Sequence, residues 1–266
     1  MKTLRIIDWN ISYTGKANEK LEFLNEIMGD GDCIVMLQEV TLDTYEIIRE
    51  YFGQRLNMEY SLDYRPPGKF DTKSRKLGVA ICSTPGMEIV SADVIKRSLF
   101  PDRTLKATVK YKDNYIKVMT LHSITGCQHK KAKSIQFFSF AEAVDEFHPD
   151  ILGMDANEPK VDSLNFEDLV FFDNHDKGKG AKTFFNTIRK NGLVDVYRQT
   201  CESNKSKHEN CLEVSHKING KVARRYDYIY LKPEKFNGLS CEYLYKEAIE
   251  AGGDHAIVVA DTEVVK

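Results

Sequence analysis

Carboxylate, amide and imidazole side chains stand at the ends of apolar runs along this sequence. In four runs the polar group follows the apolar stretch, and in two others it comes first. The groups are Asp8-Trp9-Asn10, Gln38-Glu39, His122, Asp155-Ala156-Asn157, Asp227 and Asp254-His255. If the last two runs are strands antiparallel to the other four, all six polar ends meet at one edge of the sheets. The pattern therefore predicts one polar site built from strand ends.

The residue types at these ends suit metal binding and proton transfer. Glu39 and Asp254 supply hard oxygen ligands for magnesium or manganese, which keep several waters and take only one or two carboxylates from a protein. Asp155 and Asn157 are two residues apart and point the same way from an extended chain, whereas Asp254 and His255 are adjacent and point differently. One of that last pair can bind metal while the other handles substrate. The histidines are too scattered along the chain to suggest a zinc cage.

Cleavage of a phosphodiester is one chemistry that such a set of groups could serve. It requires a positioned water, a metal and cations that neutralise the pentacovalent phosphorus, and a proton for the leaving oxygen. A histidine held by a carboxylate keeps one tautomer and can carry a positive charge near neutral pH. The acid, amide and imidazole side chains together supply these needs.

The elements that must position these groups follow from hydrophobic periodicity. Apolar runs predict strands at 4–11, 33–37, 77–82, 105–109, 115–121, 151–154, 226–231 and 256–260. Apolar positions on one face predict helices over 21–28, which Gly29 and Gly31 can close, and over 137–148. Residues 58–121 read as successive strands with short turns and no helix, so hairpins are expected there. We therefore predict an α+β fold in which two mixed sheets pack face to face with helices outside.

Composition limits the class of protein. With 42% hydrophobic residues among 266, the chain can build a sizeable core, which excludes a disordered or fibrous protein. The net charge of −2 excludes a global field that would hold nucleic acid or an anionic membrane, so any anion binding must be local. Six cysteines without a Cys-x-x-Cys pair exclude a disulfide scaffold and thioredoxin chemistry.

The same features predict where and in what form the protein works. Charges near the N-terminus and the lack of an apolar run of about 18 residues predict a soluble cytoplasmic protein with no membrane segment. No repeat or linker divides the sequence, so we expect a single domain over residues 1–266 that acts as a monomer.

In their order along the chain, these motifs resemble the endonuclease/exonuclease/phosphatase superfamily, also called deoxyribonuclease I-like. The segments that carry the resemblance span residues 9–255 and are Trp9-Asn10, Leu37-Gln38-Glu39, Leu121-His122, Gly153-Met154-Asp155-Ala156-Asn157, Arg225-Tyr226-Asp227-Tyr228-Ile229 and Asp254-His255. Each segment alone is weak evidence for the resemblance, but six segments in the family's order are strong evidence. The resemblance implies a four-layer α/β/β/α sandwich. Met154 and Gly253 stand where the family often has a second glycine and a serine, and neither departure removes a catalytic group.

The resemblance also implies a role for each acidic and amide residue, with Mg²⁺ or Mn²⁺ as cofactor. Glu39 would be the principal metal ligand, with Asn10 beside it and Asp254 completing the metal site. Asp155 would orient or deprotonate the attacking water, and Asn157 would hold the phosphate.

The same resemblance implies that two histidines and one arginine act at the phosphate. His255, paired with Asp227, would bind a non-bridging phosphate oxygen or take part in proton transfer. His122 is similar to the family's additional histidine at the phosphate. Arg103, at the start of a strand, resembles its phosphate-contacting arginine.

These features favour a nuclease that hydrolyses nucleic-acid phosphodiester bonds with an activated water. The basic clusters Lys69–Lys76 and Lys130–Lys133 adjoin strand turns, where loops of this family contact substrate, and are candidates for binding the phosphate backbone. His216 is a candidate for substrate approach. Asp63 and Tyr64 are candidates for the tyrosine or second acid that some nucleases carry in their middle strands.

Two other functions remain open at this point. One is a phosphatase or phosphodiesterase of a small or lipid phosphate on the same fold. The other is a non-catalytic binding protein that kept the fold, and the retention of Glu39, Asp155, Asn157, Asp227 and His255 argues against it.

Overall fold

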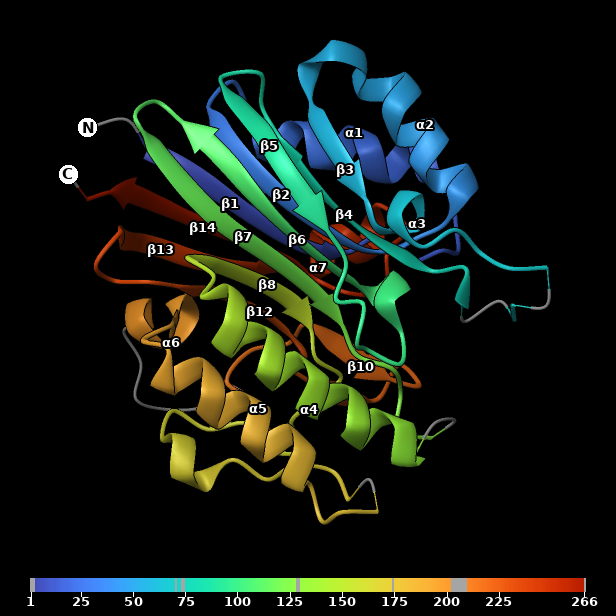
Figure 1. Cartoon of the computed structure of the whole chain (residues 1–266), viewed down its shortest axis with the longest axis vertical. Helices are drawn as coiled ribbons and strands as arrows, with labels where there is room; N and C mark the ends of the chain where they lie inside the picture. The colour runs from blue at the N-terminus through green and yellow to red at the C-terminus, as the bar shows by residue number, and fades with distance from the viewer. Residues whose placement is uncertain are drawn as a thin grey trace.

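The hydrophobic core lies between two six-stranded sheets in the computed structural model, which describes residues 3–69, 71–72, 75–127, 130–173, 175–201 and 210–265 (Figure 1). The first sheet, in the order β13-β14-β1-β2-β4-β3, consists of β13 (Phe236–Leu244), β14 (Ile257–Val264), β1 (Thr3–Asn10), β2 (Asp32–Val40), β4 (Gly78–Ser83) and β3 (Asn57–Tyr60). The second, in the order β5-β6-β7-β8-β12-β9, consists of β5 (Met87–Asp93), β6 (Thr104–Tyr111), β7 (Asn114–His122), β8 (Ile151–Asp155), β12 (Asp227–Leu231) and β9 (Val194–Asp195). A separate two-stranded sheet pairs β10 (His216–Ile218) with β11 (Val222–Arg224).

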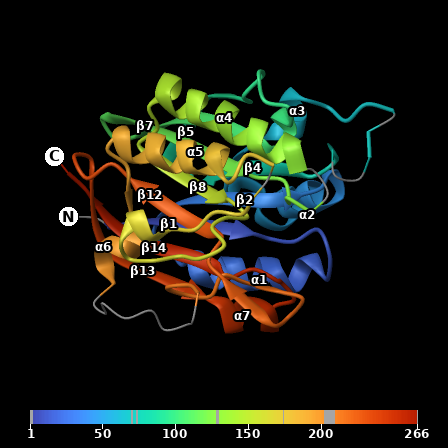
Figure 2. The ribbon, with the colours of Figure 1, turned by 90° about the horizontal axis from the view of Figure 1, so that it is seen from below.

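Helices cover the outer face of each sheet. The longer ones are α1 (Ala17–Met28) and α2 (Leu42–Phe52) on the first sheet, and α4 (Lys130–Phe147) and α5 (Lys179–Lys190) on the second. Figure 2 shows the layers in order, from α4 and α5 through the two sheets to α1 and α7 (Tyr245–Glu250). Shorter helical segments are α3 (Ser61–Tyr64), α6 (Val196–Thr200), and the 3-10 turns η1 (Gly53–Arg55), η3 (Pro101–Arg103) and η4 (Phe166–Asp168). The predicted four-layer sandwich of two mixed sheets is confirmed.

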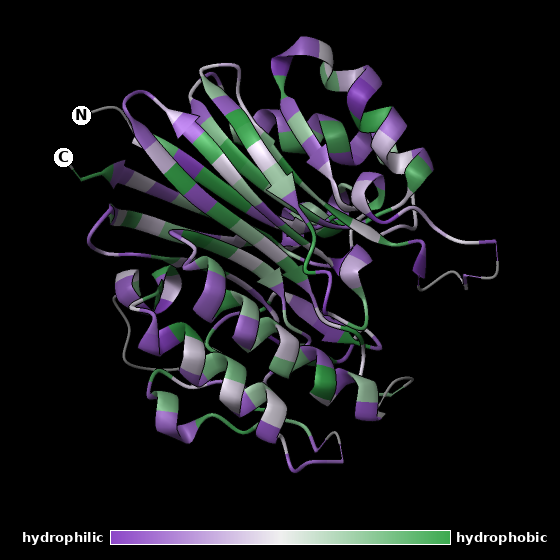
Figure 3. Ribbon diagram, in the orientation of Figure 1, coloured by the Kyte–Doolittle hydropathy of each residue, from purple (hydrophilic) through white to green (hydrophobic). Residues whose placement is uncertain are grey.

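Strand alternation explains why β1 contributes apolar side chains to two cores. Side chains two residues apart share a face of a strand. Leu4 and Ile6 therefore join the core between the sheets, while Ile7 and Trp9 join the core beneath α1. Figure 3 shows polar residues returning at the outer faces of the helices and at the strand edges. A strand covered on both faces carries mostly apolar side chains, and the buried Asp8 of β1 is an exception that accepts a hydrogen bond from Gln38.

The predicted strands and the two predicted helices are present, with α1 ending at Gly29, whose φ of 60° favours glycine. One prediction was wrong, and one long strand was missed. The segment 58–121, in which no helix was expected, contains the one-turn helix α3 and the turn η3. The nine-residue strand β13 was not predicted, because its Asn, Gly, Ser and Glu residues obscure the alternation of apolar and polar side chains. Within the described ranges, no helix combines the length and the apolar character that crossing a membrane requires.

Candidate active site

Four polar side chains lie at the same end of the gap between the two sheets. Asn10 of β1, His122 of β7, Asp155 of β8 and Asp227 of β12 each continue the positions of their strand that face the opposite sheet. The register pairs Asp155 with His122 on one side, through the parallel β7–β8 ladder, and with Asp227 on the other, through the antiparallel β8–β12 ladder. The structure thus brings together strand ends that lie far apart in the sequence.

Asp155 is the centre of this arrangement and is 1% exposed. The amide of Asn10 crosses from the first sheet and donates to Asp155 Oδ2 at 2.9 Å. The backbone N–H of Asn157 donates to Asp155 Oδ1 at 2.9 Å. These bonds hold the carboxylate in one orientation from two sides.

The loop that follows β8 is held in an uncommon backbone conformation. Asn157 has a φ of 49°, and its side-chain amide donates to Ser123 O at 3.0 Å and to Asp155 Oδ2 at 3.3 Å. Lys133 of α4 donates to Asn157 O at 2.7 Å and forms a buried ion pair with Glu158 at 3.0 Å. Non-glycine residues with positive φ persist where the surroundings over-determine them, and they concentrate at functional sites.

A histidine and a carboxylate pair on the other side of Asp155. His255 Nδ1 donates to Asp227 Oδ2 at 2.9 Å, and the ring's Nε2 lies 4.0 Å from Asp155 Oδ2. The indole N–H of Trp9 donates to His255 O at 3.2 Å, which holds the backbone of this residue in place. The ring therefore presents Nε2 toward Asp155.

Burial and neighbouring charges move the pKa values of both groups. Burial and the nearby Asp227 carboxylate raise the pKa of Asp155 to about 7. Burial disfavours the imidazolium of His255, but the carboxylates of Asp227 and Asp155 outweigh it and raise its pKa to about 10. The site thus pairs a carboxyl group that titrates near neutrality with a positively charged imidazole.

His122 is held by Arg103, the last residue of η3. The two side chains are 5% exposed or less, and Arg103 Nη1 lies 2.8 Å from His122 Nδ1. A guanidinium only donates, so the ring accepts from Arg103, whose Nη1 also lies 3.2 Å from His122 Nε2. That atom lies 3.5 Å from Asp155 Oδ2 and 3.8 Å from Glu39 Oε1. Burial and the Arg103 charge lower the pKa of His122 well below its ordinary value, so the ring is neutral.

Glu39 and Asp254 lie on the open side of the site. Glu39 sits at a bulge of β2 with a φ of 59°, its side chain is 19% exposed, and Oε2 accepts a 3.4 Å hydrogen bond from Tyr13 N. Asp254 is exposed. Burial lowers the pKa of Lys20, although the nearby Asp254 and Glu39 carboxylates act to raise it. Lys20 donates to Ile11 O and Ser12 O at 2.8 and 2.9 Å and also to Thr14 O.

The oxygen atoms at this open side fit a hard divalent cation. Mg²⁺ needs only one or two carboxylates and keeps several waters, and Glu39 provides a carboxylate that is partly exposed to solvent. Among the described residues, Asn10 Oδ1 accepts the N–H of Ser12 at 3.1 Å, and an amide oxygen has two lone pairs. Among the described residues, two sets of three His, Cys, Asp or Glu side chains bring their ligand atoms within 4.8 Å of one another. Glu39 belongs to neither set.

A buried polar network beneath the site was not predicted. Gln38 Nε2 donates to Asp8 Oδ1 at 2.8 Å and to Thr120 Oγ1 at 3.0 Å, which links the two sheets. Burial, with Asp227 and Asp155 nearby, raises the pKa of Asp8 well above its ordinary value. A Cβ on Gly153 would lie 2.4 Å from Asp8 Oδ1, so only glycine allows the sheets to approach here.

Two lysines of the basic cluster Lys130–Lys133 differ in their exposure to solvent. Lys133 is 2% exposed and paired, so it cannot contact a polynucleotide, and the expectation was wrong for this residue. Lys131 is exposed. Residues 70, 73 and 74 and the side chain of Lys130 lie outside the described residues.

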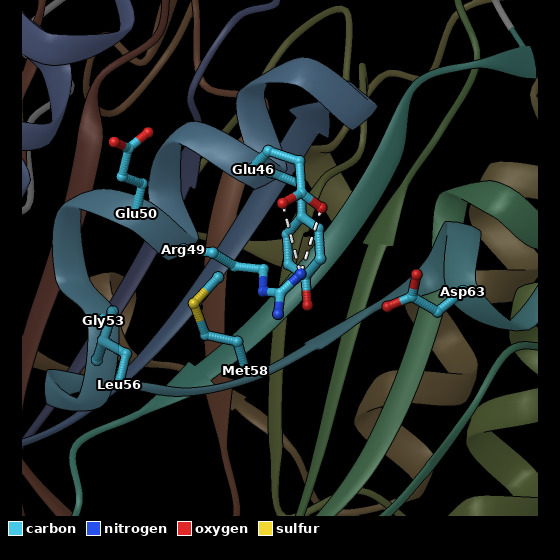
Figure 4. Close-up of a pocket in the computed structure, with 8 residues that line it drawn as sticks. Glu46, Arg49, Glu50, Gly53, Leu56, Met58 and Asp63 are labelled. Carbon is cyan, nitrogen blue, oxygen red and sulfur yellow. Dashed lines mark hydrogen bonds and ion pairs between the residues drawn. The ribbon is translucent and has the colours of Figure 1, made fainter.

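The candidates Asp63 and Tyr64 lie elsewhere. Tyr64 donates its hydroxyl to Glu59 Oε2 at 2.7 Å. Asp63 lines a pocket of about 720 Å³ beside α2, where Figure 4 shows it across from Arg49, which is paired with Glu46. These contacts place neither residue with the cluster around Asp155.

The architecture is shared with solved structures of low sequence identity. The endonuclease/exonuclease/phosphatase protein from Bacteroides vulgatus has a TM-score of 0.66 at 15% identity, covering 100% of both chains. The Neisseria 3′ phosphatase NExo bound to a product DNA hairpin has a TM-score of 0.66 at 18% identity, covering 98% of this chain and 99% of that one. D. rerio TDP2 complexed with a single-strand DNA product has a TM-score of 0.65 at 15% identity, with 98% and 99% covered. No protein-family model and no curated protein matches the sequence.

The chain therefore has the deoxyribonuclease I-like fold of the endonuclease/exonuclease/phosphatase superfamily. The resemblance that the sequence motifs carry is confirmed at the level of the fold. In this fold the six motif segments supply the strand ends described above.

Proposed function

We propose that the protein is a divalent-metal-dependent phosphodiesterase that hydrolyses nucleic-acid phosphodiester bonds. The observation that carries this proposal is the arrangement around Asp155, in which a carboxyl group that titrates near neutrality faces a charged His255 and a neutral His122. Such groups can take a proton from water and stabilise negative charge on a phosphoryl oxygen.

Each residue has a step that its contacts allow. The Asp155 carboxylate receives a proton from the attacking water while the water oxygen bonds to phosphorus and the ester P–O bond breaks. The leaving oxygen takes a proton from solvent. The Nε2–H of His255 donates to a non-bridging oxygen, because the Nδ1 of this ring is engaged with Asp227. His122 lies beside Asp155 and would contact the same phosphate. Asn157 shapes the wall of the site, since Asp155 and Ser123 orient its amide.

Mg²⁺ or Mn²⁺ fits the open side. Glu39, Asn10 and Asp254 would hold the ion, which when bound would polarise a phosphoryl oxygen. Arg103 would act through His122, which it contacts at 2.8 Å, rather than by direct approach from its buried position.

A polynucleotide substrate is supported by two structurally similar proteins, from D. rerio and Neisseria, that were solved with DNA products. A second candidate, removal of a terminal phosphate, is favoured by the Neisseria protein's description as a 3′ phosphatase. A non-catalytic binding protein is disfavoured because buried charges at Asp155, Asp227 and His255 are costly to keep without a use.

The test is hydrolysis of a substrate panel by purified protein with magnesium. The panel contains single- and double-stranded DNA, RNA, 3′-phosphorylated oligonucleotides and small phosphate esters. Asp155→Asn should remove activity on the preferred substrate, and the exposed Asp113→Asn serves as the matched control. Equal activity of Asp155→Asn and wild type, or turnover that persists in excess chelator, would refute the proposal.

A further inference from the structure

Tyr13 is an exposed aromatic residue in the loop between β1 and α1, and its backbone lies against Glu39. Its N–H donates to Glu39 Oε2 at 3.4 Å, and the residue is 54% exposed. Within the described part of the chain, its hydroxyl makes no hydrogen bond and its ring makes no stacking contact. The ring is therefore available to a ligand that occupies the open side of the site.

The loop that carries Tyr13 is held from inside by a buried lysine. Lys20 of α1 is 2% exposed and donates to Ile11 O at 2.8 Å, to Ser12 O at 2.9 Å and also to Thr14 O. These bonds fix carbonyl groups on both sides of Tyr13. The backbone of the loop is thus anchored, while the tyrosine ring stays outside.

The backbone conformation of the loop is also constrained. Ser12 has a φ of 57°, and its N–H donates to Asn10 Oδ1 at 3.1 Å. Gly15 has a φ of 84°, and a Cβ at this position would lie 2.9 Å from Gly252 O. Such conformations persist where the surroundings over-determine them. An aromatic ring on a loop that is already ordered loses little conformational entropy when it binds a ligand.

The other exposed aromatic side chains of the described residues lie elsewhere. They are Tyr64, Tyr115 and Phe138. Tyr64 donates its hydroxyl to Glu59, and Phe138 belongs to α4, which covers the outer face of the second sheet. Tyr115 stands near the start of β7, whose opposite end carries His122. Of these exposed rings, Tyr13 is the one whose backbone contacts a residue of the site.

His216 is a second ring near the site, but it is already stacked within the protein. Its ring lies on the His255 ring with centroids 4.3 Å apart and an interplanar angle of 27°. The residue is half-buried, and the Tyr226 ring lies 6.1 Å from it. A ligand would have to displace these neighbours to use the faces that they cover. Tyr13 offers a ring without this cost.

We propose that Tyr13 stacks on a nucleobase of the substrate beside the phosphate that reacts, so that the enzyme prefers phosphoesters that carry a base. This inference rests on the proposed function and deepens it. The groups around Asp155 would contact the phosphate, which every phosphoester has and which carries no information about the rest of the substrate. Every base has a π-face, so stacking on an aromatic side chain separates nucleotides from base-free esters with little preference among bases.

The test compares the binding of two oligomers with the same number of phosphates, an oligothymidylate and a base-free abasic oligomer. All proteins carry Asp155→Asn, so that binding is measured in magnesium without turnover. The parent protein should bind the oligothymidylate at least about fivefold more tightly, the lower end of base–aromatic stacking. Tyr13→Ala should reduce this preference at least about fivefold. The control Tyr115→Ala, at an equally exposed tyrosine far from the site, should keep it.

An unchanged preference in folded Tyr13→Ala, or no preference in the parent protein, would overturn the proposal. Tyr13→Phe separates the ring from its hydroxyl. The phenylalanine variant should keep the preference, because it retains the aromatic face. A loss in Tyr13→Phe as large as that in Tyr13→Ala would show that the hydroxyl acts and would also overturn stacking.

Tyr13→Trp provides a direct signal of stacking. Trp9 is the only tryptophan of the chain and is fully buried, so the new exposed indole reports on the loop. Its emission should be quenched by the oligothymidylate and not by the base-free oligomer. Binding of the oligothymidylate without quenching would contradict contact between ring and base. If the wild type hydrolyses no member of the substrate panel, the proposed function fails, while these binding measurements still decide whether Tyr13 stacks on a base.

Discussion

Asp155 and Glu39 are both carboxylates of one site, yet their surroundings differ. Asp155 is 1% exposed and held by the amides of Asn10 and Asn157, with His122 and His255 close by. The Glu39 side chain is 19% exposed and accepts one long hydrogen bond, from Tyr13 N. We call Asp155, Asn157, Asp227, His122 and His255 the buried half of the site, and Glu39 with Asp254 the open half.

The difference indicates a division of work. A buried, hydrogen-bonded group cannot rearrange, so it suits proton transfer and charge stabilisation, which need preorganised geometry. An exposed carboxylate can exchange water and ions, which suits binding of a hydrated cation. Changes in the buried half should therefore alter stability, turnover and pH dependence, and changes in the open half should alter metal affinity.

The largest effect is expected from the ion pair that supports the buried half. Lys133→Met removes the ammonium group from the buried Glu158 carboxylate, which keeps the hydrogen bond from Phe172 N, and should lower the free energy of unfolding by about 3–5 kcal/mol. Urea denaturation measures the change. Lys131→Met, an exposed lysine of the same helix, should stay within about 0.5 kcal/mol of wild type. Adding Glu158→Gln to Lys133→Met should recover part of the loss, and no recovery would argue against a charge effect.

The next effect concerns the imidazole that faces Asp155. His255→Ala should lower turnover at least about a hundredfold at saturating magnesium, the scale of a lost transition-state group. The exposed His175→Ala is the matched control, and melting curves exclude unfolding. A folded His255→Ala enzyme with a normal rate would remove His255 from the chemistry.

The pH dependence separates the two halves further. Asp155 must be ionised to accept a proton, and its pKa of about 7 means that kcat/KM should rise with pH up to about 7, falling about tenfold per unit below it. Asp227→Asn removes the neighbouring negative charge and should move this limb to lower pH, whatever its effect on the absolute rate. A limb near the ordinary Asp value of 3.8 in wild type would contradict the buried environment.

The smallest effect is expected at the surface. If Lys131 contacts a polynucleotide backbone, Lys131→Glu should raise KM a fewfold and reduce the slope of log KM against log salt by about 1. Hydrolysis of a small model diester should be unchanged. Equal changes on both substrates would place Lys131 outside any nucleic-acid contact.

The strand ends and their residues were predictable because each lies in a long apolar run whose polar terminus is visible locally. The juxtaposition of Asp155 with Asp227 followed from strand direction alone. The buried lysines were not predictable, since Lys20 and Lys133 stand on helices, where a lysine usually faces solvent. Their partners are a set of backbone carbonyls and a glutamate distant in sequence, which no periodicity records.

His216 was a candidate for substrate approach, but its stacking on the His255 ring was not predictable, for a related reason. β10 has only three residues, and its bridge to His255 is a long-range contact. The Asp8–Gln38–Thr120 network likewise depends on the distance between two sheets, which is set by Gly153. Local patterns therefore predict which residues reach the site, whereas tertiary packing decides what holds them.

Magnesium titration of turnover in wild type, Asp155→Asn and Glu39→Gln tests the division between the two halves most directly. Asp155→Asn should lose at least about a hundredfold in kcat at saturating magnesium with little change in the titration midpoint. Glu39→Gln should shift the midpoint to higher magnesium by at least about tenfold, with kcat largely restored at saturation. The opposite assignment, with Asp155→Asn changing only the midpoint and Glu39→Gln only kcat, would contradict the account.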